Sequence, residues 1–209
     1  MGKALSYLRF VAVIIALFFI LGRLLFINGI RGKSEARGFR FRRKFTAAAK
    51  RILGLKTIIK GAVPKGTFLF VANHRSLTDP IIVLNDVDAY VVSKAEVAKY
   101  PLIGKGAEET GVIYVQRSEK SSREAAKEAI RGGLAEGKSI LIYPEGTTSQ
   151  EETTMPFKRG SFDVAVNAGI PVIPIAIDYK HPDNYWFNRG MITHFVDVFS
   201  RKTNPAMIW

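Results

Sequence analysis

The chain has 209 residues, of which 47% are apolar and 23% are charged, so it suits one globular domain and is not a disordered or low-complexity chain. Its net charge of +13 arises from the first 60 residues, which contain 14 basic residues and one acid, while residues 61–209 contain 17 of each sign. This uneven distribution argues against a nucleic-acid-binding fold, which usually spreads its cations over the folded surface. The lack of cysteine excludes disulfides, thiolate metal sites and a cysteine nucleophile.

An apolar segment stands at the beginning of the chain. Residues Phe10–Gly22 carry no charge, and the apolar character extends over residues 4–27 if Arg9 and Arg23 are included. A helix of this kind either spans a membrane or dips into one leaflet, with the two arginines near the lipid headgroups. The residues after Gly22 offer no small-x-small cleavage site for a secretory signal. The alternative, a helix in the core of a soluble protein, would require buried partners for both arginines.

A second, basic segment follows. On a helix, basic side chains would surround a narrow stripe of five apolar residues: Phe41, Phe45, Ala48, Ile52 and Leu55. Such a helix beside a membrane anchor is typical of one that lies on anionic lipid, and the alternative is a charged helix packed on the protein. Eleven cations in residues 28–60 favour the cytoplasmic face of the inner or plasma membrane. We therefore expect residues 1–60 to form a membrane-associated helix pair and residues 61–209 to form a separate domain.

The second part of the chain alternates between apolar strand-like runs and helical stretches. Helices are predicted over residues 121–136 and 162–168. Strands are predicted over residues 67–72, 89–92, 111–116, 139–143 and 172–177, with a further edge strand over residues 193–199. This alternation predicts an α/β fold with a largely parallel sheet flanked by helices.

The first candidate catalytic residues come directly after the first of these strands. His74 and Asp79 are five residues apart in a segment where open α/β sheets place reactive groups. A short loop can bring the Asp carboxylate to one imidazole N–H, which leaves the other ring nitrogen as a base. Alone, the pair is equally compatible with a helix-capping Asp and an unrelated loop His. Ser76 raises a third possibility, a compact Ser-His-Asp hydrolase, but it lacks the G-x-S-x-G nucleophile turn.

Three later segments bring charged groups to other strand ends. Residues 111–117 end in Arg117, residues 141–147 contain Glu145, and residues 172–175 form an apolar run with a proline. Together with the segment Asn73–Asp79, in this order, they resemble the four sequence blocks of the glycerolipid acyltransferases, and most of all the 1-acylglycerol-3-phosphate (lysophosphatidic acid) acyltransferases. The segments 93–96 and 157–160 are also similar to that family. The resemblance covers residues 65–178, and the two N-terminal segments resemble the membrane-dipping helix pair of bacterial members.

The resemblance implies transfer of a fatty acyl group from a thioester to the hydroxyl of a lysophospholipid, which gives phosphatidic acid when the acceptor is 1-acylglycerol-3-phosphate. His74 would be the general base, oriented by Asp79, and no metal or bound cofactor would be required. The implied partners are anionic membrane lipid, the lysophospholipid, and acyl-CoA or acyl carrier protein as the donor. The candidate substrate-binding residues are Lys94, Arg117, Glu145, Gly146, Thr147 and Arg159. Of these, Lys94 and Arg117 are the first candidates for the acceptor phosphate, and Glu145 could instead form a structural ion pair.

One position departs from the pattern of the family. The third block commonly ends in Arg, whereas this chain has Thr148 there, so a possible phosphate-binding cation is missing. Other acceptors therefore remain open, namely another lyso-lipid, a lyso-aminolipid or glycerol 3-phosphate. An alternative of another class is a non-catalytic protein that keeps the fold and binds lipid, although the intact His74/Asp79 pair argues against it.

Overall fold

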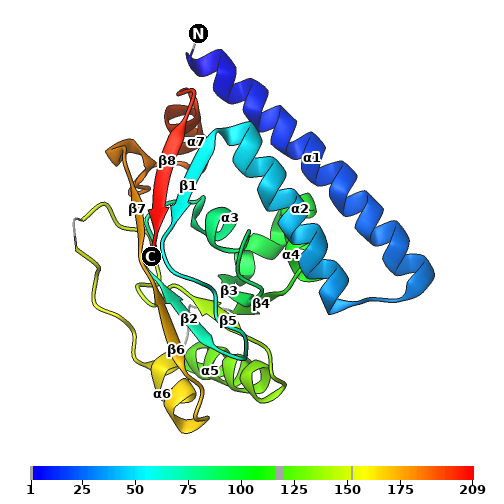
Figure 1. The fold of residues 1–209 in the computed structure, drawn as a ribbon, viewed down its shortest axis with the longest axis vertical. Coiled ribbons are helices and arrows are strands. Elements are labelled where there is room, and N and C mark those ends of the chain that lie inside the picture. The colour runs from blue at the N-terminus through cyan, green and yellow to red at the C-terminus, as the bar shows by residue number, and fades with distance from the viewer. Residues whose placement is uncertain (1, 116–119, 152) are drawn as a thin grey trace.

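The structure is a computed structural model that describes residues 2–115, 120–151 and 153–209 (Figure 1). Its helices are α1 (Gly2–Arg31), α2 (Glu35–Leu53), α3 (Asp79–Val83), α4 (Pro101–Glu109), α5 (Lys120–Ala135), α6 (Gly160–Asn167) and α7 (Met191–Phe199), with 3-10 turns at Ala95–Lys99 and Pro182–Asn184. Its strands are β1 (Leu55–Ile59), β2 (Leu69–Ala72), β3 (Tyr90–Lys94), β4 (Val112–Val115), β5 (Ile140–Ile142), β6 (Val172–Ile175), β7 (Ile177–Tyr179) and β8 (Asn204–Ile208).

The main sheet has five strands in the order β4-β3-β5-β2-β6, and every neighbouring pair is parallel. The first four predicted strands are confirmed, with ends shifted by one or two residues. The fifth is divided, because residues 172–175 pair with β2 as β6, whereas residues 177–179 pair with β8 as β7. All five carboxyl ends lie along one edge of the sheet, and β2 is next to the central strand β5. The α/β fold with a parallel sheet is therefore confirmed.

Helices cover both faces of this sheet, which explains why its strands are apolar throughout. Leu69 and Val71 of β2 point to the face that α5 and α6 cover. Phe70 and Ala72 point to the opposite face, where α2, α3 and α7 supply the packing partners. Alternate residues of one strand thus belong to two separate apolar clusters, one on each face of the sheet.

A second, smaller sheet has the order β1-β8-β7, in which β8 is parallel to β1 and antiparallel to β7. The predicted edge strand over residues 193–199 is wrong, because these residues lie in the helix α7. The apolar run is compatible with a strand, but its buried residues pack into the core from a helix: His194, Phe195, Val196, Val198 and Phe199. Residues 194, 195, 198 and 199 among them follow helical spacing.

The helices α1 and α2 form an antiparallel pair, and α1 also contacts α7 and α4 directly (Figure 1). The 30-residue α1 is long and apolar enough to cross a membrane, with a mean hydropathy of 2.9 over a window that is 17% buried. One side of it packs through Leu17, Leu21 and Leu24. The other side exposes large apolar residues, among them Leu8, Val11, Ile15, Phe18, Phe19, Phe26 and Ile30.

The Arg9 side chain lies against the protein. Its guanidinium donates to the backbone carbonyls of Phe199, Arg201 and Lys202, where α7 ends. Cations near a helix C-terminus satisfy its free carbonyls. Arg23, by contrast, is exposed.

The apolar side of α2 is packed within the protein. Phe41 and Ala49 are buried, and the Arg42 guanidinium donates to the carbonyls of Val87, Ala89 and Thr110. The helix ends at Gly54, whose φ of 67° is in the left-handed region. The expected apolar stripe therefore stops before Leu55, which begins β1 and pairs with Asn204. Because β1 belongs to the same sheet as β7 and β8, residues 1–60 are built into the fold of the second part.

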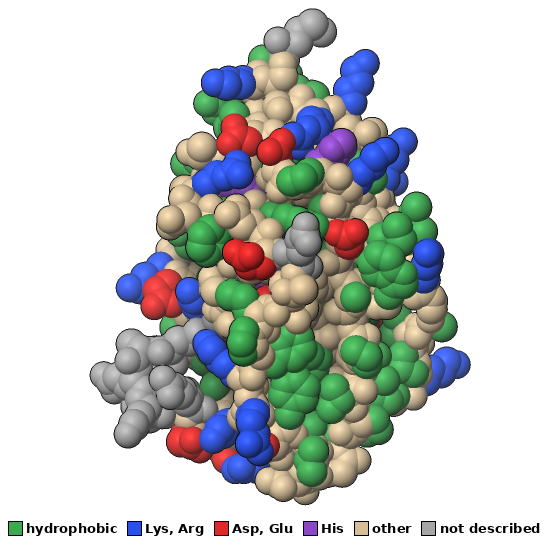
Figure 2. Space-filling view, turned by 90° about the vertical axis from the view of Figure 1, so that its left-hand side faces the viewer, with side chains coloured by type: hydrophobic (Ala, Val, Ile, Leu, Met, Phe, Trp, Pro, Cys, Tyr) green, Lys and Arg blue, Asp and Glu red, His purple; other side chains and the backbone are tan. Residues whose placement is uncertain are grey.

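The face of the molecule in Figure 2 carries basic and acidic side chains interspersed, with apolar side chains gathered toward its lower part. This agrees with the equal numbers of basic and acidic residues after residue 60.

Candidate active site

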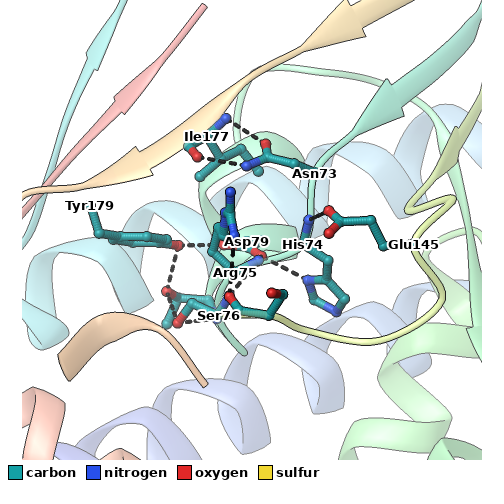
Figure 3. A network of polar contacts seen from close by, with 10 residues as sticks. Asn73, His74, Arg75, Ser76, Asp79, Glu145, Ile177 and Tyr179 are labelled. Atoms are coloured by element: carbon teal, nitrogen blue, oxygen red, sulfur yellow. Dashed lines mark hydrogen bonds and ion pairs between the residues drawn. The ribbon is translucent and has the colours of Figure 1, made fainter. Parts of the chain in front are cut away.

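His74 and Asp79 meet at the carboxyl end of β2, as the sequence analysis predicts (Figure 3). The His74 Nδ1 atom lies 2.7 Å from Asp79 Oδ2. The Asp79 side chain has no exposed surface, whereas 22% of the His74 side chain is exposed. With Nδ1–H donating to the carboxylate, the Nε2 atom is left to act as a proton acceptor. The chain turns back at this point because α3 begins at Asp79, followed by Pro80 in its first turn.

The buried carboxylate of Asp79 has three further donors. Asp79 Oδ2 accepts the backbone N–H groups of Arg75 (2.6 Å) and Ser76 (2.8 Å), and Oδ1 accepts the Tyr179 hydroxyl (2.6 Å). Burial and the neighbouring Asp79 raise the pKa of Tyr179 well above its ordinary value, so this hydroxyl stays a donor. A buried charge requires such hydrogen bonds. Sequence reasoning missed Tyr179, because its partner is 100 residues away in the chain.

The Ser76 hydroxyl is not placed as a nucleophile. It is fully buried and accepts from the hydroxyl of Thr78 at 3.2 Å, on the Asp79 side of the loop. This arrangement gives no support to a Ser-His-Asp hydrolase, in which the serine hydroxyl faces the free imidazole nitrogen.

Asn73 links β2 to β7. Its side-chain amide donates to the carbonyl of Ile177 (2.9 Å), and its amide oxygen accepts the N–H of the same residue (2.7 Å). The side chain thereby imitates a strand neighbour and fixes the backbone directly before His74 (Figure 3). Its place before the His was the only signal for this role in the sequence.

Tyr143 and Glu145 approach His74 from the end of β5. The rings of Tyr143 and His74 stack with centroids 4.3 Å apart and planes inclined by 26°. The two Glu145 carboxylate oxygens accept the backbone N–H groups of His74 (2.8 Å) and Met155 (3.0 Å). Glu145 is 5% exposed, so the structure uses this carboxylate to hold the backbone of the base. Sequence reasoning expected acceptor binding here and missed the stacked tyrosine.

The segment after Glu145 closes against the catalytic loop through further backbone contacts. The Ser149 N–H donates to the His74 carbonyl at 3.1 Å. The Arg75 guanidinium donates to the carbonyl of Glu151, and the Arg75 carbonyl accepts the Trp186 N–H at 2.7 Å. Two segments of the chain, residues 149–151 and Trp186, thus fix the loop that carries His74.

The remaining candidate residues lie in different surroundings. Lys94 is exposed at the carboxyl end of β3, on the same edge of the sheet as His74. Arg159 is exposed and lies 3.9 Å from Asp163 of its own helix. Thr147 is exposed, and Gly146 donates its N–H to the Tyr143 carbonyl at 3.0 Å. Arg117 lies outside the described residues.

No group of three or more His, Cys, Asp or Glu side chains that could hold a metal ion occurs within the described part of the chain. The chemistry that this site supports is proton transfer by His74, with Asp79 stabilising the imidazolium.

A His–Asp pair beyond a strand of a parallel α/β sheet is an arrangement that can support general base catalysis. The model of the Acyltransferase family matches residues 54–178, which is more than half of the chain. The chain therefore belongs to the Acyltransferase family, as the sequence blocks indicate. The match includes Asn73, His74, Asp79, Tyr143 and Glu145, and Tyr179 follows directly after it.

Curated relatives differ in the acceptor that their names state. The chain is 35% identical, over 58% of its length, to 47% of a lyso-ornithine lipid O-acyltransferase from Pseudomonas aeruginosa. It is 28% identical, over 56% of its length, to 45% of a 1-acyl-sn-glycerol-3-phosphate acyltransferase from Neisseria gonorrhoeae. The chain thus spans about half the length of these relatives. The crystal structure of the 1-acyl-sn-glycerophosphate acyltransferase from Thermotoga maritima shares the fold, with a TM-score of 0.71, 22% identity, and coverage of 100% of this chain and 84% of that chain.

Proposed function

We propose that this protein transfers a fatty acyl group from a thioester, acyl-CoA or acyl-acyl carrier protein, to the hydroxyl of a lyso-lipid. His74 Nε2 removes the proton of the acceptor hydroxyl while that oxygen attacks the thioester carbonyl. An ester C–O bond forms, the C–S bond breaks, and the imidazolium returns the proton to the leaving thiolate. The single observation that carries this proposal is the 2.7 Å contact between His74 and the buried Asp79.

The acceptor that we place first is 1-acylglycerol-3-phosphate, which would make the product phosphatidic acid. The relatives with this acceptor in their names and the exposed Lys94 at the edge of the sheet support it. A second candidate is a lyso-ornithine lipid, an amino-acid-derived acceptor without a phosphate monoester. Two relatives with that acceptor in their names, 35% and 29% identical, and the Thr148 position favour it.

We also propose that the exposed apolar side of α1 lies in one leaflet of a membrane. The other side of α1 packs on α2 and α7, which supports a helix that lies along the lipid surface more than one surrounded by lipid. Among the cations of residues 28–60, Arg40, Lys44 and Arg51 are exposed and would favour an anionic, cytoplasmic surface.

The test is an acceptor panel with one acyl-CoA and release of free CoA as the readout. Lysophosphatidic acid, lyso-ornithine lipid, glycerol 3-phosphate and lysophosphatidylcholine are compared in the same detergent. The His74→Ala variant serves as the control for uncatalysed thioester hydrolysis. Thiol release by the parent that equals release by His74→Ala with every acceptor, from acyl-CoA and from acyl-acyl carrier protein alike, would refute an acyltransferase activity and favour a lipid-binding protein.

A further inference from the structure

The side chain of Lys158 covers the turn that follows β5. The Lys158 backbone N–H donates to the Pro144 carbonyl at 3.0 Å, which pairs the segment before α6 with this turn. Gly146 in the turn has a φ of 78°, and the Lys158 ammonium occupies the space that a β-carbon on Gly146 would fill. The absence of a side chain at residue 146 therefore lets a cation lie directly on the turn.

This turn is in contact with the base. Tyr143, at its start, stacks on the His74 ring, and Glu145, within it, accepts the His74 backbone N–H. The strands β5 and β2 are parallel neighbours, so the turn and His74 lie at the same edge of the sheet. Lys158 thus belongs to the rim of the candidate site, although it is 84 residues from His74 in the sequence.

The charge of Lys158 has no protein counter-ion in the part of the chain that the structure describes. Acidic residues of α5 and α6 pair with other cations. Asp163 lies 3.9 Å from Arg159, and Glu124 pairs at 2.8 Å with Lys127, which packs on Gly160. The nearby Glu145 carboxylate is occupied by two backbone N–H groups and makes no ion pair with Lys158. An exposed lysine on the turn that contacts His74, without a carboxylate partner among the described residues, is suited to an anion of the substrate.

We propose that Lys158 binds the anionic headgroup of the acyl acceptor, a role that rests on the proposed function. In lysophosphatidic acid the phosphate is attached to the carbon next to the one that carries the reacting hydroxyl. A cation beside His74 therefore meets this phosphate, whereas the phosphates of CoA lie at the far end of the pantetheine arm from the thioester. Lys158 supplies from a neighbouring segment the positive charge that Thr148 does not provide.

The test uses the full chain with the substitution Lys158→Met, which keeps much of the apolar stem over Gly146 and removes the charge. The KM for lysophosphatidic acid should rise by about 10- to 100-fold, the range expected for a lost charge-assisted contact, with kcat within about threefold of the parent. The KM for acyl-CoA should not change. Lys158→Arg should keep most of the affinity. The control Lys65→Met, which changes an exposed lysine before the amino end of β2, should behave as the parent.

Two kinetic outcomes would overturn the assignment. One is an increase in the KM for acyl-CoA with an unchanged KM for lysophosphatidic acid, which would make Lys158 a donor-binding residue. The other is an equal effect with 1-acylglycerol, which lacks the phosphate, and that would assign Lys158 a structural role. If the parent transfers no acyl group at all, the proposed function fails separately. Calorimetric binding of lysophosphatidic acid in detergent micelles then decides, since equal affinities of the parent and Lys158→Met would refute the inference.

Discussion

At the scale of single residues, the Asp79 carboxylate depends on a donor from a distant strand. Tyr179→Phe removes the hydroxyl that donates to Asp79 Oδ1 at 2.6 Å and leaves that oxygen buried. The loss of one buried hydrogen bond to a charged group costs about 1–3 kcal/mol. We therefore expect kcat to fall by about 10- to 100-fold while KM for either substrate is unchanged, because Tyr179 acts through Asp79. A steady-state comparison with Tyr185→Phe, an exposed hydroxyl bonded to Asp178, is the matched control.

A second residue-scale prediction concerns the buried His194, which stacks on Trp186 at 5.7 Å. Its pKa is lowered to about 4, first by burial and then by the charge of Arg189, while Asp197 and Asp79 oppose the change. In the unfolded chain its pKa is near 6.5, so below that pH the unfolded state binds the proton that the folded state rejects. The free energy of unfolding should therefore fall as the pH decreases from about 6.5 to 4, by at most about 3 kcal/mol from this group.

Urea unfolding between pH 4 and pH 7 checks this expectation against His194→Phe. The phenyl ring can keep the stacking on Trp186 and cannot titrate. The variant should therefore lose less stability than the parent over this range. Parallel pH profiles for the two proteins would show that His194 is not the group responsible.

At the scale of elements, Arg42 fastens α2 to the loops that precede β3 and β4. Its guanidinium donates to three backbone carbonyls, and burial lowers its pKa to about 10, so it stays charged at neutral pH. Arg42→Met leaves these carbonyls without their donor and should cost about 2–4 kcal/mol of unfolding free energy. Arg43→Met removes an exposed ion pair with Asp88 and should change stability by less than about 1 kcal/mol. Equal losses in denaturant titrations of the two variants would contradict this role of Arg42.

The elements also show how far the sequence alone predicts the structure. The main strands and their parallel arrangement follow from local apolar runs, because both faces of that sheet are covered. The strands β1 and β8 are not predicted by the sequence. Residues Leu55–Ile59 pair with a segment about 150 residues away, and three of the five are exposed, so they form no buried apolar run. The apolar residues 193–199 suited a strand equally well, and only their burial against the core decides for a helix.

The sequence likewise predicts only the local part of the candidate site. The His74–Asp79 contact lies within five residues and could be inferred from spacing. The roles of Asn73, Glu145 and Tyr179 could not, because their partners are more than 70 residues away and two of the three contacts involve backbone atoms. The position of Lys158 could not be inferred either, because only the fold brings its side chain onto the turn at Gly146.

At the scale of the whole molecule, the exposed side of α1 is expected to carry the membrane contact. Phe19→Asp places a charge on this side at a residue that is 68% exposed. Co-sedimentation with vesicles that contain anionic lipid should therefore fall by at least about tenfold, since a charge in the apolar layer costs on the order of 2–3 kcal/mol. Val166→Asp on α6 changes a residue that is 75% exposed and should leave sedimentation unaltered. A loss with Val166→Asp that matches the loss with Phe19→Asp would place the lipid contact elsewhere.

The hydrogen bonds between Arg9 and the end of α7 bear on the kinetics of the proposed acyl transfer. A helix tied by its side chain to three carbonyls of the body cannot swing away from it, so a lipid-bound α1 would hold the catalytic edge at a constant height above the surface. An enzyme held this way encounters its acceptor by lateral diffusion in two dimensions. Its rate should then follow the mole fraction of acceptor in the surface. Adding inert lipid or detergent at a fixed bulk acceptor concentration should slow turnover, and a rate that ignores this dilution would mean that the acceptor reaches His74 from the aqueous phase.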